Sequence, residues 1–139
     1  MRKKLLTIFG ASGLVGSSIL REALERGYDV NGTLRDVENQ DRIARLKNLP
    51  SGKNTNFFSA TMSDISSLNN PLKNADAAFI CCLIPTYKGF DGTPAKELDD
   101  ERGYNEIIKP TVDGCLNILK TAKKNSVQNI IICSSTSST

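Results

Sequence analysis

Five short apolar runs are spaced along the chain, and each of them predicts a buried β-strand. The run ADAAFICCLI at residues 75–84 is almost continuously apolar, which is typical of a strand covered on both faces of a sheet. The first run, KLLTIF, ends at Gly10, a residue that commonly follows a strand. The predicted strands are residues 4–9, 28–35, 54–60, 75–84 and 127–133.

Stretches of helical periodicity separate these runs. In GLVGSSILREALERG apolar residues recur at helical spacing with charged residues between them, and Gly27 ends the pattern. Asp64 is the expected N-cap of a short helix that Pro71 should end, and Pro110 should kink the last helix. The predicted helices are residues 13–27, 37–50, 64–72 and 95–125, with a polar loop at 85–96.

The alternation of strands and helices predicts an α/β fold. Apolar strands joined by helices favour a parallel sheet with helices on both faces, and right-handed crossovers make it doubly wound, in the order 3-2-1-4-5. The 139 residues suit one domain, residues 1–139. Ligands of such sheets bind beyond the carboxyl ends of the strands, where the first and fourth strands diverge.

Three glycines at a spacing of three follow the first strand, in the stretch FGASGLVGSSIL (residues 9–20). Gly10 permits a sharp turn, Gly13 removes a side chain from the path of a phosphate, and Gly16 lets the following helix pack closely. The helix N-terminus offers free N–H groups to a pyrophosphate. The turn therefore predicts dinucleotide binding by Gly10, Ala11, Ser12, Gly13, Leu14, Val15 and Gly16.

Composition excludes several classes of function. The chain has four cysteines without a C-x-x-C pair and no histidine, so we expect no metal site and no catalysis by a Ser-His-Asp or Cys-His group. The net charge of +3 comes without a basic stripe, and no apolar run approaches the length of a membrane span. We expect a cytosolic protein that binds neither nucleic acid nor membranes.

Three motifs resemble the extended short-chain dehydrogenases/reductases, near dihydroflavonol reductase and cinnamoyl-CoA reductase. They are GASGLVGSSILREALERGYDVNGTLRD at 10–36, NEIIKPTVDGCLNILKTA at 105–122 and IIICSS at 130–135, and together they extend the resemblance over essentially the whole chain. The resemblance implies a Rossmann-like fold and a reductase that uses a nicotinamide cofactor on a small-molecule carbonyl compound.

The residue after the second strand predicts which nicotinamide cofactor is bound. NAD-selective enzymes place Asp or Glu there, whereas this chain has Arg35, whose guanidinium can hold a phosphate. The resemblance implies that Arg35 and a basic residue in the next helix, here Arg42, bind the 2′-phosphate of NADP. NAD is the less favoured alternative. The simpler interpretation of Arg35 is a solvated charge paired with Asp36.

The resemblance also assigns the remaining cofactor contacts. The family has an Asp-Leu pair beside adenine after the third strand, where this chain has Thr61 and Met62, with Asp64 as a possible substitute. The expected contacts of the nicotinamide ribose, after the fourth strand, are Cys81, Cys82 and Leu83. Cys81 and Cys82 are also candidates for redox activity, against the simpler interpretation that they fill a tight space.

The resemblance places a carbonyl-binding serine after the fifth strand. Alignment assigns Ser135 to this catalytic position, with Ser134 and Ser137 as rivals. The family's Tyr-x-x-x-Lys pair is absent, so we expect the cofactor-binding, N-terminal part of a longer reductase, with a C-terminally incomplete sheet and no turnover of its own. A shortened reading frame and a degenerate copy would both produce such a chain.

Two other functions fit the same residues. One is a non-catalytic NADP-binding sensor, and the other is an interaction domain that kept the fold and lost the ligand. The fifth strand would be left as an apolar edge, which favours a homodimer or aggregation.

Overall fold

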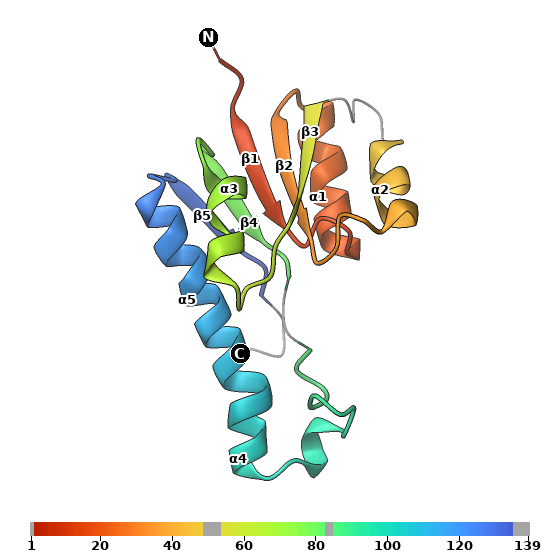
Figure 1. Cartoon of the computed structure of the whole chain (residues 1–139), viewed down its shortest axis with the longest axis vertical. Helices are drawn as coiled ribbons and strands as arrows, with labels where there is room; N and C mark the ends of the chain where they lie inside the picture. Colours follow the sequence, from red (N-terminus) through yellow and green to blue (C-terminus); the bar gives the residue numbers. More distant parts are fainter. Residues whose placement is uncertain (1, 49–53, 83–84, 135–139) are drawn as a thin grey trace.

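In the computed structural model, five parallel strands form one sheet in the order β3-β2-β1-β4-β5, which confirms the predicted topology (Figure 1). The structure describes residues 2–48, 54–82 and 85–134. The strands are β1 (Leu5–Phe9), β2 (Asp29–Leu34), β3 (Thr55–Ser59), β4 (Ala77–Ile80) and β5 (Asn129–Ile132).

The register brings the carboxyl ends of the central strands to one edge. Phe9 of β1 pairs with Thr33 of β2 on one side and with Ile80 of β4 on the other. The segments that follow these strands therefore start side by side, because parallel strands in register end at the same level. Gly10, Arg35 and Cys81 are in this way brought to one edge of the sheet.

Two apolar cores lie on opposite faces of the sheet. Successive strand residues point to opposite faces, so Ile8 belongs to one core and Phe9 to the other. The core around Ile8 lies under α1 (Leu14–Glu25) and α2 (Gln40–Lys47), and the core around Phe9 lies under α3 (Asn69–Leu72) and α5 (Lys109–Lys124). Helices thus cover both faces, as Figure 1 shows.

Local sequence signals determine most helix ends. Gly27 adopts φ +85° after α1, and the N–H groups of Gly27 and Tyr28 donate to the carbonyls of Leu24 and Ala23, which terminates the helix in a Schellman arrangement. Asp64 caps the 3₁₀ turn η2 (Ile65–Ser67) by accepting from the N–H of Ser66, as its expected role as a cap requires.

Pro71 does not end its helix, contrary to the sequence prediction. It lies inside α3, within the first turn, where a missing N–H costs nothing. Its carbonyl accepts hydrogen bonds from two buried side chains of the sheet, the hydroxyl of Thr7 at 2.5 Å and the amide of Asn31 at 3.0 Å. These bonds satisfy polar groups that would otherwise be costly to bury.

The last helical stretch is more irregular than its pattern predicts. It comprises η3 (Ala95–Glu97), α4 (Asp100–Gly103), the π-helical turn η4 (Tyr104–Ile108) and α5. The N–H of Lys109 donates to the carbonyl of Tyr104, five residues back. Pro110 follows directly and has no N–H for an ordinary helical bond, so the widened turn is how the chain accommodates it.

The strand β5 lies at one edge of the sheet and is exposed. Ile131 and Ile132 keep 44% and 46% of their surface accessible, which confirms the predicted apolar edge. Among the helices of the described ranges, none combines the length and the apolar character needed to cross a membrane.

Candidate nucleotide-binding site

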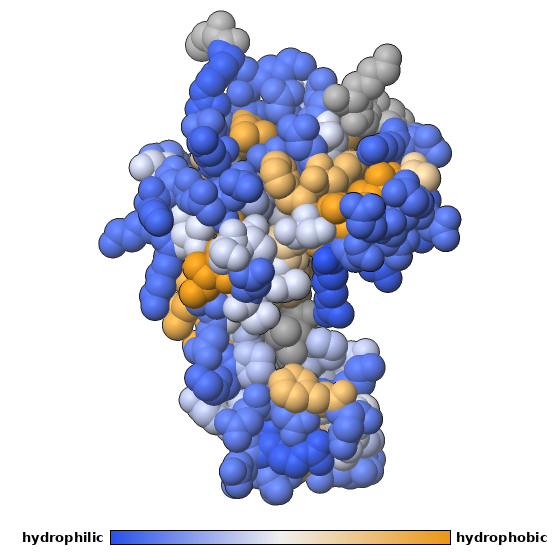
Figure 2. All heavy atoms as spheres, viewed as in Figure 1, coloured by the Kyte–Doolittle hydropathy of each residue, from blue (hydrophilic) through white to orange (hydrophobic). Residues whose placement is uncertain are grey.

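A groove of about 920 Å³ opens at the carboxyl edge of the sheet. The outline of the molecule narrows between the part that carries the sheet and the lobe that contains α4 (Figure 2). The lining comes from the segments that follow β1 to β4, from the start of α2, from the loop before α4 and from the middle of the last helical stretch. The sequence-predicted site residues in this lining are Gly10, Ser12, Gly13, Arg35, Arg42, Thr61, Met62, Cys81 and Cys82.

Two of the three glycines are required by the protein itself. Gly10 has φ +82°, and a Cβ there would lie 3.0 Å from the backbone of Cys81 and Cys82. A Cβ on Gly16 would overlap the carbonyl oxygen of Gly10 and lie 2.8 Å from its carbonyl carbon. The close approach of Gly16 is therefore to the turn after β1, rather than to the body of the sheet.

Gly13 has no such requirement. Its φ of −75° suits any residue, and the nearest atom to a Cβ would be the carbonyl oxygen of Gly10 at an ordinary 3.5 Å. It lies at the N-cap of α1, whose first turn carries neither a side-chain cap nor an acidic residue. First-turn N–H groups without partners favour an anion, so the bare backbone at Gly13 fits an incoming pyrophosphate.

The other residues of the turn do not line the groove with their side chains. Ala11 is fully buried, and its N–H donates to the carbonyl of Thr33 at 2.9 Å. Leu14 and Val15 instead border a separate apolar hollow of about 630 Å³ between α1 and the sheet. Ala11, Leu14, Val15 and Gly16 therefore contribute to the shape of the turn through their backbone, and not to the groove wall through their side chains.

Arg35 and Arg42 line the same groove from the end of β2 and the first turn of α2. The N–H of Arg42 donates to the side chain of Asn39, which caps α2 and fixes where that helix begins. The Asp36 carboxylate accepts from the N–H of Glu38 at 2.8 Å. Within the described residues neither arginine forms an ion pair, so both guanidinium groups remain available for an anionic ligand.

The two candidates for the adenine contact, the pair Thr61 and Met62 and the substitute Asp64, differ in their surroundings after β3. Thr61 and Met62 line the groove. The Asp64 carboxylate instead accepts from the N–H of Ser66 at 3.1 Å and from its hydroxyl at 2.6 Å, so it serves as a cap. The Met62 carbonyl accepts from the Asn117 side chain of α5 at 2.9 Å, which holds this segment beside the groove.

The two cysteines after β4 are partly buried in the groove wall. Burial raises the pKa of the Cys82 thiol to about 11, and burial likewise raises the pKa of Cys81. A thiol of raised pKa is a poor nucleophile, so the geometry favours packing over redox chemistry. No cluster suited to a metal ion occurs among the described residues. The predicted contacts Leu83 and Ser135, and the rival Ser137, lie outside those residues.

The far end of the groove contains residues that sequence reasoning missed. They come from the loop before α4, from the π-helical turn η4 and from the first turn of α5: Phe90, Asn105, Lys109 and Pro110. Lys109 forms an ion pair with Asp113 at 2.8 Å, one helical turn on. An aromatic residue within the Gly-rich polar segment KGFDGT was the signal in the sequence that could have found Phe90.

A doubly wound parallel sheet with a glycine turn at its central strand, and with a groove at the carboxyl edge, defines a dinucleotide-binding protein of the Rossmann type. A family model described as NAD(P)H-binding matches residues 10–139. The chain therefore belongs to this NAD(P)H-binding family.

Reductases are among its relatives. Dihydroflavonol 4-reductase of Dianthus caryophyllus is 33% identical over 129 residues, which are 92% of this chain and 33% of the relative. An anthocyanidin reductase of Vitis vinifera is 31% identical over 134 residues, 96% of this chain and 36% of the relative. A solved structure of ElxO with NADP bound has a TM-score of 0.75 at 22% identity and covers 96% of this chain and 56% of that one. The chain spans about a third of the length of these curated relatives.

Proposed function

We propose that this chain is the NADP(H)-binding part of an oxidoreductase that reduces a carbonyl compound. The observation that carries the proposal is the pair Arg35 and Arg42, two groove-lining arginines that form no ion pair with any described carboxylate. A 2′-phosphate needs positive charge at the end of β2, where an acidic residue would select NAD. The reductases among the relatives support the reaction class.

Each part of the groove has one task in this proposal. Arg35 and Arg42 hold the 2′-phosphate, and the N-terminal amides of α1 beside Gly13 hold the pyrophosphate. Thr61 and Met62 form the wall at the adenine. The bound cofactor supplies the hydride, and the carbonyl compound is a small molecule that meets it at the far end of the groove.

One observation favours a second function, a non-catalytic NADP-binding sensor. Reduction of a carbonyl needs a positioned proton donor. None of the three tyrosines, Tyr28, Tyr87 and Tyr104, belongs to the groove lining. We therefore expect the 139-residue chain to bind NADP(H) without turning it over.

The cofactor preference is tested by calorimetric titration of NADP and NAD. Wild type should bind NADP more tightly, and Arg35→Ala should lose about ten- to a hundredfold of NADP affinity, because one charge-assisted contact contributes about 1.5–3 kcal/mol. NAD affinity should change little in this variant. Arg45→Ala is the matched control, since it removes the same charge from an exposed position of α2 outside the groove. Equal NADP and NAD affinities in the wild type would contradict the proposal.

Turnover tests whether this chain is catalytic by itself. Oxidation of NADPH is followed by the absorbance of the reduced ring with a panel of aldehydes and ketones. Tight NADP binding without turnover supports the sensor or an enzyme part that lacks its proton donor. Turnover that disappears in Arg35→Ala would show that the chain is catalytic by itself.

A further inference from the structure

The loop before α4 is a small, tightly bonded hairpin. Lys88 and Pro94 form an antiparallel bridge, and the N–H of Gly89 donates to the carbonyl of Thr93 at 2.8 Å. Gly92 takes φ +85° at its tip. The backbone of this hairpin, residues 87–95, is therefore internally ordered rather than an open connection.

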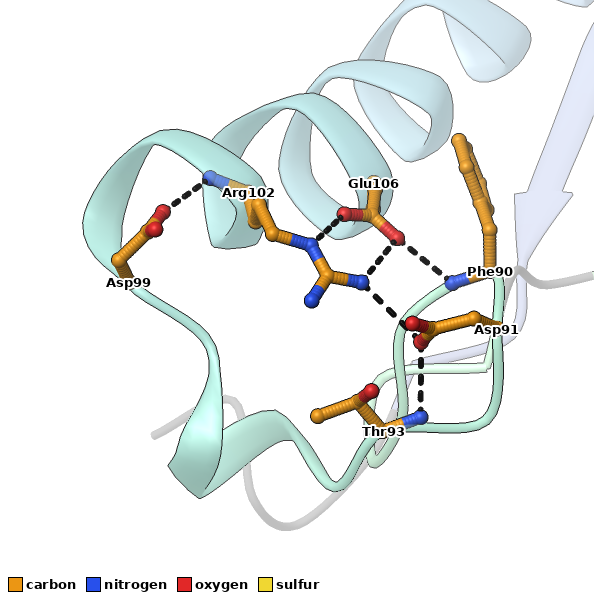
Figure 3. A network of polar contacts seen from close by, with 6 residues as sticks. All are labelled: Phe90, Asp91, Thr93, Asp99, Arg102 and Glu106. Atoms are coloured by element: carbon orange, nitrogen blue, oxygen red, sulfur yellow. Dashed lines mark hydrogen bonds and ion pairs between the residues drawn. The ribbon is translucent and has the colours of Figure 1, made fainter.

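A polar network fastens the hairpin to the helix that follows it (Figure 3). Arg102 reaches Glu106 at 2.6 Å with Nε and Asp91 at 3.0 Å with a terminal nitrogen. The second carboxylate oxygen of Glu106 accepts from the N–H of Phe90 at 2.8 Å. Asp99 caps α4 by accepting from the N–H of Arg102, which fixes the helical turn from which Arg102 extends.

The packing beneath the hairpin leaves little freedom for its backbone. The Glu106 carboxylate lies directly beneath Gly89, where a Cβ would be only 2.9 Å from Oε1. The position of Phe90 is thus set from both sides, by a hydrogen bond to its N–H and by contact at the preceding residue. Arg102 orients the carboxylate that provides both.

The hairpin held in this way presents an exposed aromatic ring at the groove. Phe90 keeps 74% of its surface accessible and lines the far end of the groove. Tyr87 offers a comparison, because it is 69% exposed on the same hairpin but does not belong to the groove lining. A large ring whose backbone is held in place by a network, yet which is left in water, would gain apolar contact when a ligand binds against it.

We propose that Phe90 is the apolar wall against which the nicotinamide ring of the bound cofactor rests, and that Arg102 is the positioning residue that holds this wall. The inference rests on the proposed NADP(H) binding. Arg35 and Arg42 bind the adenosine end and the turn at Gly13 binds the middle of the dinucleotide. The nicotinamide half then occupies the end where Cys82, Pro110 and Phe90 supply small or apolar surface.

Two ligands of different reach test this placement. NADPH spans the whole groove, whereas adenosine 2′,5′-bisphosphate carries only the adenosine half. Phe90→Ala should weaken NADPH binding about three- to tenfold, the factor that corresponds to an aromatic stacking contact, and should leave the bisphosphate affinity within twofold of wild type. Phe90→Tyr should restore NADPH binding, and Tyr87→Ala, which removes an equally exposed ring, should change neither ligand.

Arg102 is tested by the same pair of ligands and by the fluorescence of bound NADPH, which reports the surroundings of the reduced ring. Arg102→Ala should weaken NADPH selectively and shift its bound emission towards that of free NADPH. Arg102→Lys should rescue only part of both effects, because an ammonium group cannot bridge Glu106 and Asp91 as the guanidinium fork does.

The outcomes distinguish this inference from the proposed function. If wild type binds both ligands and Phe90→Ala changes neither affinity, or weakens both equally, the placement of Phe90 is wrong while NADP binding stands. If wild type binds neither ligand, the proposed function fails, and the inference fails with it.

Discussion

The glycine turn allows packing and ligand binding to be tested separately. Gly16→Ala places a methyl group against the Gly10 carbonyl, which is backbone and cannot move aside. Overpacking of this kind costs about 1–3 kcal/mol, and the better helix propensity of alanine regains about 0.5–1 kcal/mol. We expect a net loss of about 1–2 kcal/mol, which lowers Tm by about 3–10 °C in a chain of this size.

Gly13→Ala should behave in the opposite way. The methyl group meets no protein atom closer than 3.5 Å, and φ of −75° suits alanine. Reduced freedom of the unfolded chain contributes about 0.4–1 kcal/mol, which is offset by the similar cost of alanine at an N-cap. Tm should stay within about 2 °C. NADPH binding should fall at least tenfold, because the methyl group displaces one charge-assisted hydrogen bond to the pyrophosphate, a loss of at least about 1.4 kcal/mol.

Melting curves without ligand and calorimetric titration of NADPH measure the two effects. Gly103→Ala is the matched control for Gly16→Ala, since Gly103 is also helical but a Cβ there meets nothing within 4 Å, so this variant should gain stability. The reasoning is refuted if Gly13→Ala binds NADPH like wild type, or if it lowers Tm as much as Gly16→Ala does.

Two further predictions concern pH and thiol reactivity. Hydrogen bonds from Thr93 and the Arg102 guanidinium lower the pKa of Asp91 to about 2, below the value of about 3.9 in an unfolded chain. The contribution of the Asp91 carboxylate to stability should therefore be complete above about pH 4 and be lost as the pH falls towards 2. The difference in urea midpoint between wild type and Asp91→Asn should accordingly vanish near pH 2, and a constant difference would contradict it. Burial raises the pKa of Cys82 to about 11, so iodoacetamide at pH 8 should modify Cys82 much more slowly in the folded chain than in urea, as peptide mass spectrometry would measure.

The strand order could be predicted from the sequence because it follows from alternation and handedness, which are properties of the whole pattern. The sharp turn at Gly10 followed from the glycine spacing after the first strand, whereas the close approach of Gly16 is to the Gly10 carbonyl rather than to the sheet. The role of Pro71 could not be predicted, because a proline ends a helix or begins one according to where the first turn falls. Here α3 begins after Leu68 without a side-chain cap, so that Pro71 falls within its first turn, and two side chains of the sheet bond to the Pro71 carbonyl.

The far end of the groove was hidden from sequence reasoning for a different physical reason. The position of Phe90 depends on Glu106, 16 residues later, and on an arginine that bridges Glu106 to Asp91. These bonds join the hairpin to α4 and to the π-helical turn η4, and no local propensity encodes such a contact. Arg35 and Cys82 could be placed at the groove from the sequence because they closely follow strands, whereas the place of Phe90 depends on contacts between elements. Variants at Phe90 and Arg102 therefore test tertiary structure, and those at Arg35 and Gly13 test a local motif.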